Sequence, residues 1–116
     1  THSQNDDMAV ASQASACLAN LAEMSENQAI IARDGGVRPC IAVMRSRYVE
    51  VQREAGRLLA NLCASDSDTS DMIVRGGGHQ LLISYLLSQA RSYPLSSYLR
   101  SYPRTHLRVE EDIEAE

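Results

Sequence analysis

One stretch of this chain occurs twice, and that internal repeat constrains the fold more than any other feature. The string LANL fills residues 18–21 and returns at residues 59–62, which lie 41 residues further on. The string IIARDGG at residues 30–36 aligns in the same way with MIVRGGG at residues 72–78, at an offset of 42. A period of this length is typical of solenoid repeats built from two or three helices. The chain is therefore predicted to be a stack of helical units.

Two short helices open each period. The first, over residues 27–33, stops at Gly35 and Gly36, because glycine readily adopts the positive φ that ends a helix. Pro39 suits the first turn of a second helix over residues 40–45, where a missing backbone N–H costs nothing.

A longer third helix is expected over residues 48–64. Its apolar residues follow the i, i+4, i+7, i+8, i+11 spacing of a single helix face: Val51, Ala55, Leu58, Leu59 and Leu62. On the polar side, acids alternate with arginines: Glu50, Arg53, Glu54 and Arg57. The spacing predicts one buried stripe and one solvated face.

This arrangement resembles the armadillo repeat family, whose unit is a short helix, a Gly-Gly corner, a second helix and a long third helix ending in Asn-Leu. That ending reads ACLANL at residues 16–21 and RLLANL at residues 57–62. The resemblance implies an all-α fold, a right-handed armadillo-type helical solenoid segment with an irregular C-terminal tail. It also implies that the chain is a fragment of a longer armadillo-repeat protein, in keeping with a first residue, Thr1, that is not Met.

Three segments are expected. Residues 1–7 are predicted to be a disordered N-terminal segment, and residues 8–89 to hold one complete armadillo repeat between two partial ones. Residues 90–116 are predicted to be a non-repeat tail, because Pro103 would break the third helix that the register requires there.

The resemblance points to two asparagines as partner-binding residues. In armadillo proteins such as importin-α the asparagine that matches Asn20 and Asn61 clamps the backbone of an extended peptide, since an amide offers both a donor and an acceptor. Arg53, Arg57 and Glu54 are expected to tune specificity, and the arginines favour an acidic or phosphorylated segment. The alternative is that both asparagines only tie down local helix ends.

Other chemistry finds little support. The net charge of −4 argues against a nucleic-acid partner. No catalytic residues, metal ligands or cofactor are predicted, because no triad or metal-ligand spacing occurs among the histidines and cysteines. Cys17, Cys40 and Cys63 each lie among apolar residues and are predicted to be buried, reduced thiols of a cytoplasmic or nuclear protein, with the cytoplasm preferred. The uncharged stretches, residues 8–22 and 76–90, are too short for a direct membrane span.

The predicted function is a non-catalytic protein–protein interaction scaffold or adaptor, which binds an extended segment of a protein or peptide partner on its concave third-helix face. One alternative is a structural, self-associating repeat module that forms homo-oligomers through its exposed repeat ends. Another is a nuclear-transport or membrane-tethering armadillo protein whose deciding signal, nuclear or membrane-associated, lies outside these residues. Fold alone does not separate these functions.

Overall fold

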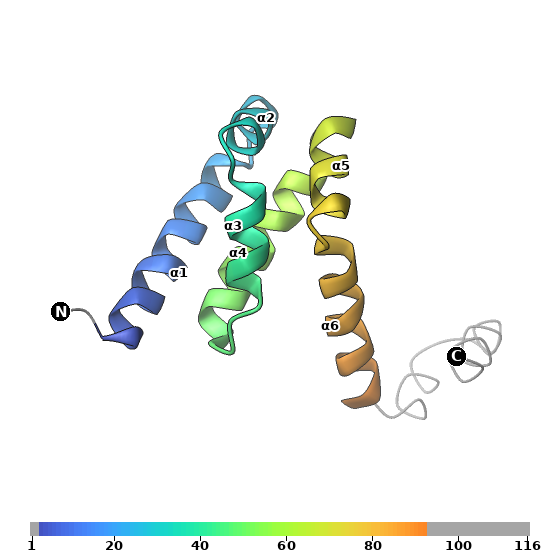
Figure 1. Cartoon of the computed structure of the whole chain (residues 1–116). Helices are drawn as coiled ribbons and strands as arrows, with labels where there is room; N and C mark the ends of the chain where they lie inside the picture. Colours follow the sequence, from blue (N-terminus) through green and yellow to red (C-terminus); the bar gives the residue numbers. More distant parts are fainter. Residues whose placement is uncertain (1–2, 93–116) are drawn as a thin grey trace, which may run out of the picture. The chain divides into compact units, whose positions relative to one another are not determined.

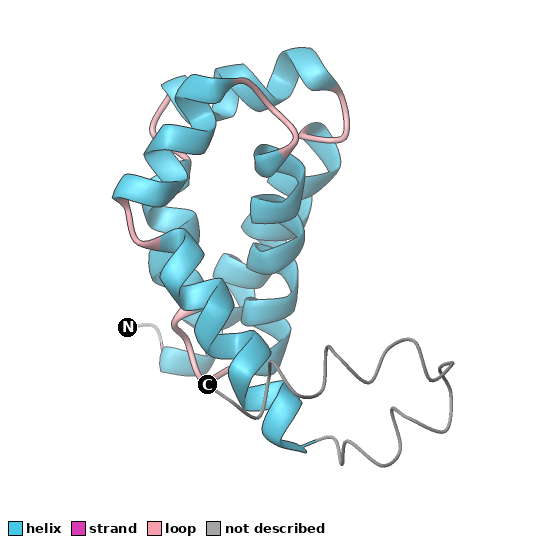
Figure 2. Cartoon of the chain, turned by 90° about the vertical axis from the view of Figure 1, so that its right-hand side faces the viewer, coloured by secondary structure: helices cyan, strands magenta, loops and turns pink. Residues whose placement is uncertain are grey.

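The computed structural model describes residues 3–92, and over these residues the chain consists of helices joined by short loops (Figures 1 and 2). No strand occurs in this part of the chain, so the predicted all-α class is confirmed. The helices in order are α1 (Gln4–Leu21), α2 (Ser25–Arg33), α3 (Val37–Met44), α4 (Val49–Cys63), α5 (Ser67–Arg75) and α6 (Gly78–Ser92).

The chain divides into two compact units, Thr1–Leu81 and Leu82–Glu116. The first unit holds α1 to α5 and the start of α6, and every contact discussed below lies within it. The second unit is described only over residues 82–92, the remainder of α6.

The N-terminal boundary was predicted wrongly. Residues 4–7 belong to α1 and are not disordered, whereas residues 1–2 lie outside the described part. Ser3 and Asp6 form a capping box: the Ser3 hydroxyl accepts from the Asp6 backbone N–H at 3.2 Å, and the Ser3 N–H donates to the Asp6 carboxylate at 3.4 Å. This reciprocal pair supplies partners to free N–H groups, so the helix begins one turn earlier than its apolar residues indicate.

The C-terminal boundary also differs. The tail was predicted to begin at residue 90, but α6 continues to Ser92. No glycine or proline interrupts the helix there, since the next helix-breaking residue is Pro94. The rest of the predicted tail, residues 93–116, lies outside the described residues.

Glycine ends the first helix of each period, as predicted. Gly35 follows α2 with φ of +91°, and Gly77 follows α5 with φ of +81°. These are the two residues of the described chain with positive φ, a conformation that is costly for any residue with a Cβ. The corners therefore recur because the backbone there demands glycine.

The core of the first unit forms around α4. The predicted stripe is buried throughout, with Val51, Ala55, Leu58, Leu59 and Leu62 each at most 2% exposed. The helix packs mainly against α1 on one side and α3 on the other (Figure 1). Removing one such aliphatic side chain from water is worth about 1.5–3 kcal/mol, so this stripe is the main source of stability.

The cysteine prediction was only partly correct. All three thiols are free, but only Cys40 is buried, while Cys17 and Cys63 are exposed. The Cys40 Sγ donates to the Ala55 carbonyl at 3.2 Å. Burial raises the pKa of the Cys40 thiol to about 11. Apolar sequence neighbours do not guarantee burial, because successive residues of a helix point in different directions.

We predict that two glycine substitutions have opposite effects on stability. A Cβ on Gly36 would lie 2.7 Å from Ile31 Cγ2 and 2.9 Å from the Ile31 carbonyl oxygen. Because backbone must move to relieve this clash, Gly36→Ala should lower the free energy of unfolding by about 1–3 kcal/mol. Urea unfolding followed by far-UV circular dichroism measures the change.

Gly56→Ala is the matched control. Gly56 lies in the middle of α4, and a Cβ there would meet nothing closer than Met44 Cε at 3.8 Å. Alanine should therefore raise the free energy of unfolding by about 0.5–1 kcal/mol. Equal effects of both substitutions would contradict the packing described at the corner.

Candidate partner-binding face

Two helices from neighbouring periods, α1 and α4, run side by side in the same direction. Near their beginnings the Tyr48 hydroxyl donates to Asn5 Oδ1 at 3.5 Å, and near their ends Asn61 contacts the Ala19 carbonyl. Contacts that ascend together along both helices require parallel axes. Residues separated by one period are thereby brought next to one another.

One stripe along each of these helices carries polar residues, interspersed with alanines on α1, at spacings of three and four that keep them on one side. We call this surface the α1–α4 face. It consists of Asn5, Ala9, Gln13, Ala16 and Asn20 from α1, and Glu50, Arg53, Glu54, Arg57 and Asn61 from α4.

Arg57 connects the two halves of the face. Its Nη1 donates to Asn20 Oδ1 at 2.9 Å and its Nη2 to the Ala16 carbonyl at 3.2 Å, both on α1. On α4 the same guanidinium pairs with the Glu54 carboxylate at 3.0 Å. One arginine thus fixes the position of Asn20 relative to α4, by charge-assisted hydrogen bonds.

Asn61 also acts between the helices. Its Nδ2 donates to the Ala19 carbonyl at 2.7 Å. Ala19 lies in the last turn of α1, where carbonyl groups lack the usual helical partner. Two further amides serve the same helix end, since Asn27 Nδ2 donates to the Leu21 carbonyl at 2.9 Å and Gln28 Nε2 to the Ala22 carbonyl at 2.8 Å.

Each predicted asparagine therefore uses one polar atom of its side-chain amide in a hydrogen bond within the fold. Asn20 accepts through Oδ1 and Asn61 donates through Nδ2, while Asn20 Nδ2 and Asn61 Oδ1 have no partner among the described residues. The structure brings these two side chains to one face together with Arg57. Between them they retain one donor group, the Asn20 amide nitrogen, and one acceptor atom, Asn61 Oδ1, which complement a peptide group.

The charges of the face compensate one another. Arg57 pairs with Glu54 and lies 3.9 Å from Glu23, and Arg53 lies 3.8 Å from Glu50. The Arg53–Glu50 pair is about two-thirds exposed on both sides and contributes little stability. Both arginines therefore already have acidic neighbours, with which an acidic partner segment would have to compete.

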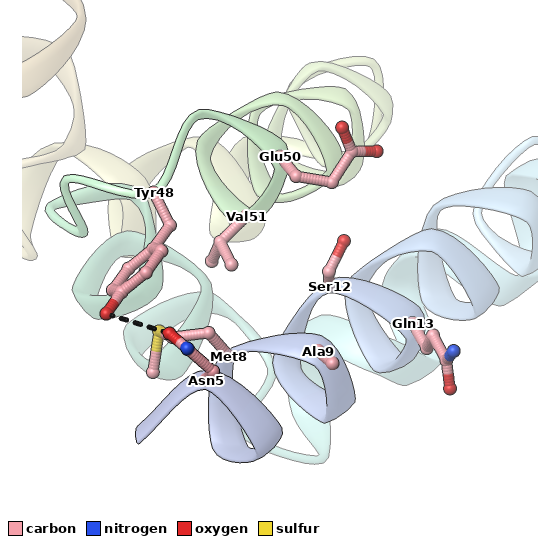
Figure 3. A pocket seen from close by; sticks show the side chains of 8 residues that line it. All are labelled: Asn5, Met8, Ala9, Ser12, Gln13, Tyr48, Glu50 and Val51. Carbon is pink, nitrogen blue, oxygen red and sulfur yellow. Dashed lines mark hydrogen bonds between the residues drawn. The ribbon is translucent and has the colours of Figure 1, made fainter. Parts of the chain in front are cut away.

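A pocket of about 460 Å³ opens at one end of the face (Figure 3). Its apolar lining comes from Met8, Ala9 and Val51, and its polar lining from two amides, two hydroxyls and one carboxylate. The lining residues are Asn5, Met8, Ala9, Ser12, Gln13, Tyr48, Glu50 and Val51. The pocket could receive an apolar side chain while its polar lining binds the neighbouring polar groups.

Sequence reasoning missed this pocket. Asn5 and Gln13 share the side of α1 that carries Asn20, and that spacing could have indicated them. Tyr48 could not have been found in this way, because it lies in the loop before α4 and reaches Asn5 only through the tertiary fold.

Residues 3–92 were also compared with the requirements of metal binding and membrane insertion. No three side chains among their histidines, cysteines, aspartates and glutamates lie close enough to bind a metal ion together. None of the helices in this part of the chain has the length and apolar character needed to cross a bilayer.

We predict that Asn61 stabilises the fold through its donor. Asn61→Ala leaves the Ala19 carbonyl without its partner and should lower the free energy of unfolding by about 1–2 kcal/mol. Asn61→Asp should lower it further, because a carboxylate cannot donate and repels the carbonyl oxygen. Asn20→Ala is the control, since its side chain is exposed and Arg57 retains Glu54; it should cost about 0.5 kcal/mol or less. Urea unfolding of the three variants would contradict this ranking if Asn20→Ala were the most damaging.

One comparison with known proteins identifies a family. Residues 24–64, which contain α2, α3 and α4, match the Armadillo/beta-catenin-like repeat. No curated protein and no solved structure matches the chain. Armadillo repeats generally serve as protein-interaction scaffolds and are typically non-catalytic. Residues 24–64 of this chain are thus an armadillo repeat.

Proposed function

We propose that this protein is a non-catalytic adaptor that holds an extended segment of a protein partner along the α1–α4 face. Asn20 has a free donor and Asn61 a free acceptor, and the face on which they lie also carries a pocket of about 460 Å³. This observation carries the proposal. An extended chain presents peptide groups at about 3.3 Å per residue and alternates its side chains. The face offers amides for the backbone and a pocket for one apolar side chain.

The residues of the α1–α4 face have different roles in this proposal. Asn20 and Asn61 bind the partner backbone, and Arg57 with Glu54 holds Asn20 in place. Arg53 and Glu50 are exposed enough to contact partner side chains and so tune specificity. Because the charges are balanced, the expected partner segment is extended and largely uncharged, with one apolar residue for the pocket.

The three free cysteines support a reducing compartment, and we propose the cytoplasm. Two of these thiols are exposed, and exposed free thiols persist in proteins where glutathione and thioredoxin keep them reduced.

Peptide selection tests the proposal. Extended peptides selected from a random library on the full chain should bind so that the side-chain amide signals of Asn20 and Asn61 shift in NMR titrations. The Asn20→Ala/Gln13→Ala variant should bind the selected peptides about five- to twentyfold more weakly, because each lost amide removes about one hydrogen bond. Fluorescence anisotropy gives the affinities.

Gln80→Ala is the matched control, because Gln80 is an exposed amide at the corner between α5 and α6. It should bind as the wild type does. Unchanged binding by the Asn20→Ala/Gln13→Ala variant, with circular dichroism showing intact helices, would refute the α1–α4 face as the binding surface.

A second function, self-association, is favoured by a different observation. Apolar side chains are exposed where the first repeat begins, with Leu21, Met24 and Ile30 about half exposed. Beside them lies a pocket of about 250 Å³ lined in part by Leu18, Ile30 and Ile31. Solenoid ends expose apolar surface unless another repeat or another copy covers them.

Sedimentation velocity separates the two functions. If the end associates, the wild type should form dimers or larger species with rising concentration, and Ile30→Glu should shift it toward monomer. Val10→Glu, which changes another exposed apolar residue on α1, serves as the control and should leave the distribution unchanged. A wild type that stays monomeric at about 100 μM, a weak affinity by interface standards, would rule out this function.

A further inference from the structure

A second pocket lies at the corners of the repeats, and its composition differs from that of the α1–α4 face. It has a volume of about 370 Å³ and is built by the end of α2, the start of α3 and the end of α5. Its apolar lining comes from Ala32, Val37 and Met72, and its charged lining from Arg33, Arg38 and Arg75. All of these residues belong to the first unit, so the pocket is complete within it. We call it the corner pocket.

The three arginines of the corner pocket have no acidic partner. Among the described residues, ion pairs within 4.0 Å involve only Arg53 and Arg57, both on α4. The Arg33 Nε donates to the Ala29 carbonyl at 3.3 Å, and no carboxylate lies within 4.0 Å of its guanidinium. The charges in this pocket are therefore available to a ligand, unlike those of the α1–α4 face.

Asp66, on the loop before α5, is near enough to interact electrostatically with Arg33, but it already caps α5. The Asp66 carboxylate caps α5 by accepting from the Thr69 N–H at 2.9 Å and from the Thr69 hydroxyl at 2.8 Å. These hydrogen bonds, with a smaller contribution from Arg33, hold the pKa of Asp66 below its usual value. Asp66 thus stays charged as a cap, and no ion pair within 4.0 Å joins it to Arg33.

Interaction with the helix dipole accounts for the positions of two of these arginines but not for that of the third. Arg33 and Arg75 lie in the last turns of α2 and α5, where a cation interacts favourably with the helix dipole. Arg38 lies in the first turn of α3, next to the positive end of that dipole, and no acid accompanies it there. A cation in this position is locally unfavourable. Such a departure from local rules is expected at a binding site.

We propose that the corner pocket binds an acidic peptide segment, in which one apolar side chain enters the pocket and the flanking carboxylates pair with the arginines. The volume suits a single side chain, and the apolar floor with a charged rim matches that pattern of residues. Charge complementarity with three unpaired arginines selects acids. A nucleic acid is disfavoured as the ligand because the chain as a whole carries a net charge of −4. This site is separate from the α1–α4 face and does not depend on it.

Fluorescence anisotropy with a defined probe tests the site. The probe is a short fluorescein-labelled peptide with a central leucine flanked on both sides by glutamates, titrated with the full chain at low salt. Arg38→Glu should weaken binding about tenfold or more, and Arg75→Gln about threefold, because each removes a charge-assisted contact. Replacing the leucine of the probe by serine should also weaken binding, since the apolar floor loses its contact.

Weaker binding of the probe by Arg38→Glu would not result from loss of folding. A glutamate in the first turn of α3 interacts favourably with the helix dipole, so Arg38→Glu should keep or raise the melting temperature while binding falls. Arg47→Glu is the matched control, because it makes the same charge change on an exposed residue of the loop before α4, outside both surfaces. It should change the affinity by no more than about twofold, the effect of a distant, screened charge.

The outcomes are distinct. Absence of probe binding, or equal losses in Arg38→Glu and Arg47→Glu, would overturn the corner pocket as a specific site. A loss confined to Asn20→Ala would assign the probe to the α1–α4 face and also overturn it. Stronger competition by a single-stranded oligonucleotide than by unlabelled probe would overturn the choice of a peptide ligand. None of these results bears on the uncharged peptides that test the α1–α4 face.

Discussion

The burial of one apolar stripe on α4 holds the first unit together. A single repeat cannot remove this stripe from water by itself, because α2 and α3 cover only part of it and α1, from the preceding period, covers the rest. The parallel arrangement of α1 and α4 follows from this need. The α1–α4 face exists because the apolar sides of the two helices are turned toward one another and the core, which leaves their polar sides together on the surface.

The side chains that bind the helices together also shape the proposed site. Asn61 supplies a donor to the end of α1, and Arg57 joins Asn20 to Glu54. Each contact satisfies a polar group that the packing would otherwise leave without a partner. What remains free, one donor and one acceptor, is available to a partner backbone. Structural and binding roles for the two asparagines are therefore compatible, although they looked like alternatives in the sequence.

The two surfaces differ in how their charges are used. On the α1–α4 face Arg53 and Arg57 have acids close by, whereas at the corner pocket Arg33, Arg38 and Arg75 have none within 4.0 Å. Arginine thus joins α1 to α4 on the α1–α4 face, whereas at the corner pocket it provides a charge with no ion-pair partner. Counting arginines along the chain does not reveal this difference, because pairing depends on which residues the fold brings near.

Much of the architecture could be read from the chain alone. The offset of 41–42 residues, the stripe from Val51 to Leu62 and the glycine corners at Gly35 and Gly77 express local rules: helix periodicity and the backbone freedom of glycine. The wrong predictions concern the start of α1 and the burial of two cysteines, where the apolar pattern along the chain was not the deciding factor. Ser3 and Asp6 started α1 before its apolar pattern began, and Cys17 and Cys63 are exposed despite apolar sequence neighbours.

Periodicity and corners are properties of neighbouring residues, so the chain alone was enough to predict helices over the described residues and an armadillo repeat within them. Which polar groups of Asn20 and Asn61 remain free, which arginines are paired and where the pockets open depend on how the helices pack. Hydrogen bonds and ion pairs act over a few ångströms, and here they join residues about 40 positions apart, such as Arg57 with Ala16 and Asn20. Their partners are set by the packing of one helix on another.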